Sequence, residues 1–333
     1  MRRALLGGLL AAACSGGATA TGAGAAATAE GVGPPPPATR GALHCAGVPR
    51  PGLAQARSEG RWGGLLVEVC RAIAAAAGRP GPTDFRAVTT PAEARGWFQQ
   101  PGEVAFLSGR DIAVAGLAGR IVPGPTVFVV QDLAMVPAAS PAQHLADLAG
   151  AGVCFMAGST AEQGPEAAFE RLGQPWLRHP FSERGEMEDA YAAGRCQAVA
   201  AEASELARIR LQPGQAALHS RLLPEPLTTF PLLAATAVAD GARWAASVAW
   251  AVYTLAAASR PGNHWFAGGA DAMPVLAPEL GLDAGWQARM LKATGSLQSI
   301  FERELGRGSR YGLPAGPNQP ADQGGLWLAP YVE

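Results

Sequence analysis

The chain has 333 residues, which is long enough for about two domains. Hydrophobic residues make up 48% of it and charged residues only 16%, but much of the hydrophobic share is alanine. No stretch offers the roughly 18–20 strongly apolar residues in a row that a membrane-spanning helix needs, which argues against a polytopic membrane protein. A net charge of −1, without a basic stripe, argues against nucleic acid as a partner.

The N-terminus has the pattern of a secretory leader. Arg2 and Arg3 precede an apolar run over residues 4–13, which has the length of a signal-peptide core and is too short to span a bilayer. Small residues at 27–29 offer a cleavage site. We therefore predict a signal peptide over residues 1–29.

A lipid anchor at Cys14 is an alternative for this region, although the position three residues before it is Ala11 instead of the usual leucine. The leader is followed by a stretch rich in glycine, alanine and threonine and then by four prolines at 34–37. Such a composition cannot bury a core, so residues 30–40 are predicted to form an extended tether.

Strands and helices alternate in the first folded stretch. A Thr-Pro-x-Glu sequence at Thr90 combines a helix N-cap, a proline at the first helical position and a capping glutamate. The alternation predicts parallel strands joined by helical crossovers. The predicted elements are a strand over 42–48, a helix over 64–77, a strand over 85–88, a helix from Thr90, and a strand over 104–107.

A second α/β unit follows residue 137. Ser140-Pro141 with Gln143 repeats the signals of a helix start, and Gly194 ends a later helix. Residues 222–226 and 228–231 are predicted to cross over, and residues 312–333 to wrap the surface. The other predicted elements are strands over 152–156 and 197–201, and helices from 158–162, over 186–193, from Ser204, and over 242–258, 284–294 and 296–305.

Four cysteines remain once Cys14 is set aside: Cys45, Cys70, Cys154 and Cys196. An even number in an exported chain indicates disulfides, and four cysteines allow three connectivities. Pairing of sequence neighbours gives Cys45–Cys70 and Cys154–Cys196, while four unbonded buried thiols are the alternative. No cysteine or histidine spacing points to a metal site, and we expect no metal and no cofactor.

Several short stretches, from residue 41 to the end, together carry a resemblance to a known family. They are Gly41–Cys45, Gly60–Trp62, Val67–Ala72, Gly102-Glu103, Val153–Thr160, Ala193–Cys196, Glu202–Ser204, Leu280–Asp283 with Trp286, Ile300–Arg303, Gly324–Leu326 and Ala329-Pro330. In their order and spacing the chain resembles the periplasmic substrate-binding proteins of polar amino-acid ABC transporters, in particular the general L-amino-acid-binding subgroup.

The resemblance implies an α/β fold, the two-lobed type II periplasmic binding protein with two hinge strands and the ligand in the cleft. Lobe 1 would comprise residues 41–134 and 233–333, and lobe 2 residues 135–232. The protein would act in the periplasm, as a monomer, and pass its ligand to an ABC permease in the inner membrane. The subgroup commonly carries four cysteines at these places, which supports the two local disulfides.

The resemblance also implies a site for a free amino acid. An arginine after the third strand of lobe 1 would clamp the ligand carboxylate. Arg120 and Arg110 are the candidates, and Arg120 is favoured because it directly precedes the predicted strand from Pro123 to Phe128. A solvated loop arginine is the alternative for either residue.

Two further parts of the site follow from lobe 2. Gly158-Ser159-Thr160 matches a second anion site, where a strand end meets a helix N-terminus; a capping box from Ser159 to Glu162 is the alternative. Glu202 matches the acidic position that pairs with the ligand ammonium, which is usually aspartate in the family. A glutamate favoured by the helix dipole is the alternative for Glu202.

The sequence also departs from the family. The loop over 111–119 contains no hydroxyl group, and residues 51–57 replace an expected aromatic wall. The leading interpretation is an exported solute-binding protein for an amino acid or a related small carboxylate. The alternatives are a ligand-less or sensory accessory protein on the same scaffold and a periplasmic dehydratase-like enzyme. Because no acid–base constellation surrounds Glu202, we expect no enzyme.

Overall fold

The computed structural model describes residues 41–79, 83–216, 218–262 and 273–330. All of them fall in one compact unit formed by Gly33–Glu333. The predicted signal peptide, the tether and the possible lipid anchor at Cys14 lie outside the described residues. In the part of the chain that is described, no helix is both long enough and apolar enough to cross a membrane.

Most strands join one mixed sheet in the order β4-β1-β5-β11-β6-β9-β7-β8, with β10 paired to β6. Strands β1, β4 and β5 are parallel, and so are β7, β8 and β9. Strands β2 and β3 form a separate pair. The strands are β1 His44–Gly47, β2 Gln55–Ala56, β3 Trp62–Gly63, β4 Asp84–Ala87, β5 Val104–Ser108, β6 Ile121–Val136, β7 Gly152–Met156, β8 Leu177–Phe181, β9 Ala198–Glu202, β10 Arg221–Leu222 and β11 Thr228–Ala237.

Helices connect the strands and continue beyond the last one. They are α1 Leu65–Ala76, α2 Pro91–Trp97, α3 Gly109–Val114, α4 Thr160–Leu172, α5 Arg184–Ala192, α6 Ala203–Arg210, α7 Pro213–Ala216, α8 Gly241–Ala257, α9 Leu276–Leu280, α10 Trp286–Thr294 and α11 Leu297–Glu304. Short 3₁₀ helices cover Ser58–Gly60, Leu145–Leu148, Val238–Asp240 and Ala321–Gln323.

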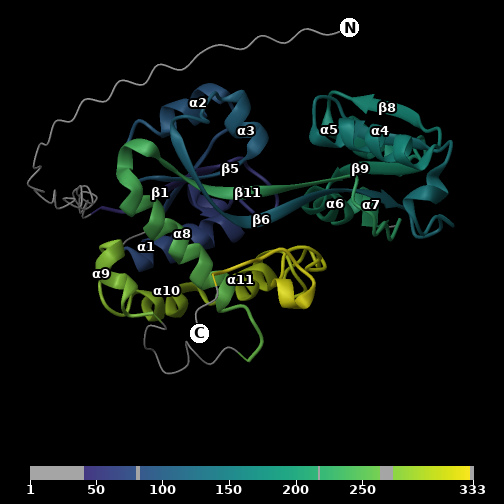
Figure 1. Ribbon diagram of the computed structural model, residues 1–333. Helices are drawn as coiled ribbons and strands as arrows, with labels where there is room; N and C mark the ends of the chain where they lie inside the picture. The colour runs from purple at the N-terminus through teal and green to yellow at the C-terminus, as the bar shows by residue number, and fades with distance from the viewer. Residues whose placement is uncertain (1–40, 80–82, 217, 263–272, 331–333) are drawn as a thin grey trace, which may run out of the picture. The chain divides into compact units, whose positions relative to one another are not determined.

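The two long strands β6 and β11 pass between two groups of elements (Figure 1). β11 pairs with both β5 and β6, and β6 pairs with both β11 and β9. We call the elements before β6 and after β11 lobe 1, and the elements between β6 and β11 lobe 2. The expected borders at residues 134 and 232 fall inside these shared strands and stay a prediction.

Alternating side chains on the central strands supply a core on each face of the sheet. In β5, Val104 and Phe106 join a cluster with α1, α8, α10 and α11, whereas Ala105 and Leu107 join a cluster with α2. In β7, Phe155 packs on the α4 side and Cys154 on the α5 side. This period of two, buried on both faces, is what parallel strands covered by helices require.

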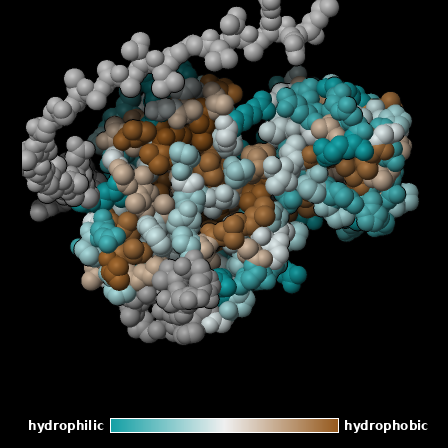
Figure 2. Space-filling model, viewed as in Figure 1, coloured by the Kyte–Doolittle hydropathy of each residue, from teal (hydrophilic) through white to brown (hydrophobic). Residues whose placement is uncertain are grey.

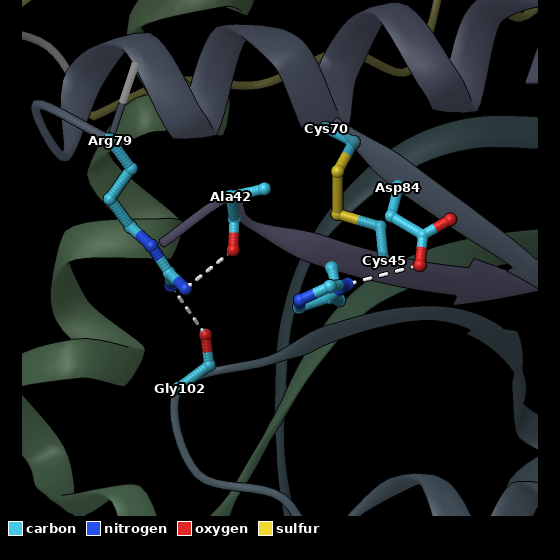
Figure 3. Close-up of a disulfide and its surroundings, with 7 residues drawn as sticks. Ala42, Cys45, Cys70, Arg79, Asp84 and Gly102 are labelled. Atoms are coloured by element: carbon cyan, nitrogen blue, oxygen red, sulfur yellow. Dashed lines mark hydrogen bonds and ion pairs between the residues drawn. A yellow bond between two sulfur atoms is a disulfide. The ribbon is translucent and has the colours of Figure 1, made fainter. Parts of the chain in front are cut away.

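Two disulfides fasten strands to their surroundings. Cys45 of β1 is bonded to Cys70 of α1, with the Cα atoms 6.1 Å apart (Figure 3). Cys154 of β7 is bonded to Cys196, with the Cα atoms 5.8 Å apart. These are the two pairs expected from sequence neighbours, and they exclude the alternative of four free thiols. One bridge lies in each lobe.

Arg79 ties the end of the first helical crossover to the starts of two strands. Its guanidinium donates to the carbonyl oxygens of Ala42 at 2.9 Å and Gly102 at 3.0 Å (Figure 3). Ala42 precedes β1 and Gly102 precedes β5. The bonds therefore hold the amino ends of two neighbouring strands together, at the edge of lobe 1 opposite to the strands' carboxyl ends.

The helix predicted from Ser140 does not form. The Arg221 guanidinium instead donates to the carbonyl oxygens of Ala138, Ser140 and Ala142. In a helix capped by Ser140, the Ser140 and Ala142 carbonyls would have to accept intrahelical bonds of the first turn, so the arginine competes directly with the helix. Only the 3₁₀ turn Leu145–Leu148 follows. By contrast, the capping box from Thr90 to Glu93 is present as predicted.

Lobe 2 has an exposed strand at the end of the sheet. In β8, each of the five residues is exposed or half-buried. Figure 2 shows mostly hydrophilic residues on the viewed face over α4, α5 and β8. β8 carries a charged residue, Arg178, and a proline, Pro180, both of which discourage an edge strand from pairing with other chains.

Candidate functional site

A cavity of about 970 Å³ lies where both lobes meet the crossing strands. It begins at the carboxyl ends of four strands: Val48 follows β1, Ser108 ends β5, Met156 ends β7 and Glu202 ends β9. Ligands of open α/β sheets bind beyond the carboxyl ends of the strands, because the loops there are free to diverge. Its ionisable lining residues are Arg50, Arg110, Asp111, Asp132, Arg184, Glu202, Glu205 and Arg208.

Arg110, not Arg120, reaches the cavity. Arg110 is the second residue of α3, directly after β5, and its side chain is exposed at the cavity. Among the described residues it has no ion-pair or hydrogen-bond partner. The stretch treated as an irregular loop in the sequence therefore contributes a helix, α3, to the site.

Arg120 lies at the other end of the sheet, which reverses the preference drawn from the sequence. It is an exposed turn residue before β6, and its carbonyl oxygen accepts from the Val238 N–H at 2.9 Å. β6 and β5 are both antiparallel to β11, so they run in the same direction and β6 starts at the end far from the cavity. Seven residues of extended chain, or about 23 Å, separate the start of β6 at Ile121 from Phe128 in the middle of that strand.

Gly158, Ser159 and Thr160 line the cavity at the start of α4. The capping box that was the alternative for this stretch is absent: the Ser159 hydroxyl donates to the Met156 carbonyl at 2.6 Å, and the Glu162 carboxylate accepts from the Gly158 N–H at 2.7 Å. The N–H groups of Thr160 and Ala161 have no acceptor among the described residues. They remain available to an anion in the cavity.

Glu202 lines the cavity at the junction of β9 and α6, but it does not cap the helix. Its carboxylate accepts from the Arg50 Nε at 3.0 and 3.1 Å. Burial raises the pKa of Glu202, and Arg50 opposes that rise. The pair joins the loop after β1 in lobe 1 to the end of β9 in lobe 2.

Asp132 is the deepest carboxyl group of the site and is 0% exposed. It stands opposite Glu202 on β9 and opposite Thr228 on β11, whose hydroxyl donates to it. Burial raises the pKa of Asp132, while Thr228, Thr160 and Arg50 lower it. The crossing strands therefore carry a buried acid directly into the floor of the cavity.

The remaining acids of the cavity are engaged by their neighbours. The Asp111 carboxylate accepts from the Ser108 N–H at 2.9 Å and from its hydroxyl at 2.7 Å, which forms a capping box for α3. Glu205 pairs with Arg208 at 2.8 Å and with Arg184 at 3.0 Å. Ser108 is thus committed to local structure and is not free to bind a ligand.

Sequence reasoning missed Arg50 and Asp132. Arg50 follows the carboxyl end of the first strand, where α/β folds place residues that bind ligands. Its position in the chain could therefore have identified it as a site residue. Asp132 interrupts a run of buried apolar residues over 127–136. A carboxyl group is costly to bury in such a strand, so its presence there was a signal of a special role. Two aromatic residues, Trp62 and Phe230, also line the cavity in place of the expected wall.

Comparison with known proteins supports the resemblance. No family model matches the chain. It is 28% identical over 304 residues to the general L-amino acid-binding periplasmic protein AapJ of Rhizobium johnstonii, covering 84% of this chain and 86% of the relative. It is 29% identical over 310 residues to the putative amino-acid ABC transporter-binding protein YhdW of Escherichia coli K12, covering 85% and 86%.

A solved ABC transporter periplasmic binding protein from Brucella ovis, with glutathione bound, superposes with a TM-score of 0.68 at 24% identity. The match covers 86% of this chain and 95% of the other. It confirms the two-lobed type II fold. The curated relatives are named as binding proteins. In sequence and in fold the chain is therefore similar to the periplasmic substrate-binding proteins of amino-acid ABC transporters.

Proposed function

We propose that the chain is the solute-binding component of an ABC uptake system in the periplasm and binds an amino acid or a related small carboxylate. The observation that carries the proposal is the cavity between the lobes. Unused hydrogen-bond donors face it from both sides, Arg110 from lobe 1 and the first turn of α4 from lobe 2. A carboxylate fits both donor types, since each offers N–H groups and positive charge.

The crossing strands support a closing motion. β6 and β11 join the lobes, and a ligand that touches both lobes stabilises the state in which they lie closer together. The closed protein would then deliver the ligand to a permease; the name of the Escherichia coli relative assigns that relative to an amino-acid ABC transporter.

Thermal unfolding of the full chain with a panel of amino acids and small organic acids tests the proposal. A ligand at 100 times its dissociation constant adds about 2.7 kcal/mol to the free energy of unfolding, which is a shift of several degrees. Arg110→Ala should reduce or abolish the shift, because a charged hydrogen bond is lost. Arg120→Ala is the matched control and should leave it unchanged. No shift with any compound would contradict the proposal.

One observation favours a second candidate, an accessory protein that binds no solute. Ser108, the hydroxyl at the end of β5, is committed to capping α3, and residues 111–119 supply no other hydroxyl. The same panel decides between the two: a folded wild-type protein whose unfolding temperature no compound changes would favour the accessory role.

A further inference from the structure

The position expected to bind the ligand ammonium is already occupied by a cation of the chain itself. Arg50 places its Nε 3.0 and 3.1 Å from the two carboxylate oxygens of Glu202. The Arg50 side chain is only 10% exposed and that of Glu202 only 21%. The ion pair is therefore shielded from water, and it connects lobe 1 to lobe 2.

The other carboxylates of the cavity also have donors within the chain. Asp111 is bound by Ser108, Glu205 is bound by Arg184 and Arg208, and Asp132 accepts from Thr228. Asp132 is fully buried and has Arg50 as its nearby cation. Each acid that lines the cavity in the described ranges is thus either paired or out of reach of a solute.

Among the described residues of the cavity, the groups without a partner are donors, except for the Oδ1 of Asp132, which is fully buried. The Arg50 Nη1 is buried and has no hydrogen-bond acceptor in the described structure. Arg110 and the first-turn N–H groups of α4 are likewise uncommitted among the residues described. A cavity with spare donors, whose acids are paired or fully buried, is matched to an anion and not to a zwitterion.

Building on the proposed function, we propose that the physiological ligand is a small dicarboxylate without an ammonium group, and that Arg50 takes the place an amino acid's ammonium would occupy. Arg50 is tethered next to Glu202, so its effective concentration there exceeds that of any free solute. An ammonium group would have to displace it and leave a buried guanidinium without its partner. A dicarboxylate leaves the pair intact and uses donors on both lobes, Arg110 and the start of α4.

Isothermal titration of the full chain with matched compounds tests this proposal. Glutarate differs from L-glutamate, and succinate from L-aspartate, only by the α-ammonium group. We expect at least one diacid to bind about ten-fold tighter than its amino acid, or more. An amino acid that binds as tightly as its diacid, or a panel in which only other compounds bind, would overturn this inference and leave the proposed function standing. A panel in which nothing binds would overturn both.

A variant tests the role of Arg50 directly. Arg50→Gln frees the Glu202 carboxylate, so L-glutamate should gain about ten-fold in affinity or more relative to glutarate. Arg57→Gln is the matched control, because Arg57 pairs with Glu304 at 2.9 Å outside this cavity; it should change neither affinity. An unchanged ratio of the two affinities in folded Arg50→Gln would overturn the role of Arg50.

A double variant covers the case in which Arg50→Gln does not fold. Arg50→Gln with Glu202→Gln removes both charges of the pair, so that Glu202 is not left as a buried carboxylate without its arginine. Circular dichroism verifies that it folds. The affinity ratio of glutarate to L-glutamate should fall toward one, because neither the blocking cation nor the acid remains. A ratio equal to that of the wild type would contradict the proposal.

Discussion

Asp132 lies on the floor of the cavity, and its burial affects the stability of the folded chain. Its carboxyl group lies in the longest strand, is 0% exposed and has one oxygen without a hydrogen-bond partner in the described structure. Burial disfavours the charged form, which is why the pKa of Asp132 is raised. Such a group weakens the fold when it ionises, so Asp132 makes the stability of the cavity floor depend on pH.

Asp132 should make stability depend on pH in a defined direction. The folded chain holds this proton to a higher pH than the unfolded chain does, so the free energy of unfolding falls as pH rises from the unfolded pKa, near 4, through the raised folded pKa. In Asp132→Asn this contribution is absent. Urea unfolding from pH 4 to pH 8 should therefore show the wild type losing stability relative to the variant, with the difference levelling off above the folded pKa. A difference that is constant over this range would contradict the assignment.

Chain order brought some of the predicted residues to the cavity and missed other residues that line it. Gly158–Thr160 and Glu202 each follow a recognisable strand, and the carboxyl ends of parallel strands share one edge of a sheet. Arg120 also adjoins a strand, but it precedes that strand and so lies at the opposite edge. Arg50 was missed because its role depends on Glu202, 152 positions away, and sequence carries no direct signal for such a contact.

At the scale of elements, β6 depends on the segment that follows α11. The Asn318 side-chain amide is 5% exposed; it accepts from the Val129 N–H at 2.7 Å and donates to the Val129 carbonyl at 2.9 Å. Val129 faces Pro231 on β11 and directs its polar groups away from that strand. Asn318 therefore makes the two hydrogen bonds to Val129 that a neighbouring strand would otherwise make, at the point where β6 leaves lobe 1.

Asn318→Ala should destabilise the protein by about 2–4 kcal/mol, because both polar groups of Val129 would be left buried and unpaired. The neighbouring Gln319→Ala is the control: Gln319 makes an exposed bond to the Gln323 carbonyl, and its loss should cost about 0.5 kcal/mol or less. Chemical unfolding monitored by circular dichroism measures both. Equal destabilisation by the two variants would show that Asn318 does not support β6.

Elements with a strong local pattern were predicted within a few residues, and those decided by distant groups were not. The helix α1 follows its apolar spacing, and α2 follows its capping signals. The helix expected at Ser140 is lost because Arg221, far along the chain, binds its carbonyls. β8 was missed because an exposed edge strand carries polar residues and a proline, and so lacks a hydrophobic alternation.

At the scale of the whole molecule, the two crossing strands determine what the cavity can do. The alternating α/β pattern predicted two layered units, but the return of the chain through β11 to complete lobe 1 followed only from the family resemblance. Because β6 and β11 belong to the same sheet as β5 and β9, a change in the angle between the lobes alters the distance between Arg110 and the start of α4. Binding and closure are thus expected to be coupled.

Hydrogen–deuterium exchange of the full chain, with and without the tightest-binding compound of the panel, tests the central claim that one small solute is held by both lobes. We predict slower exchange at two places together, in the segment 108–111 of lobe 1 and in the segment 158–162 of lobe 2. Protection confined to one lobe, or protection only outside these two segments, would contradict binding between the lobes.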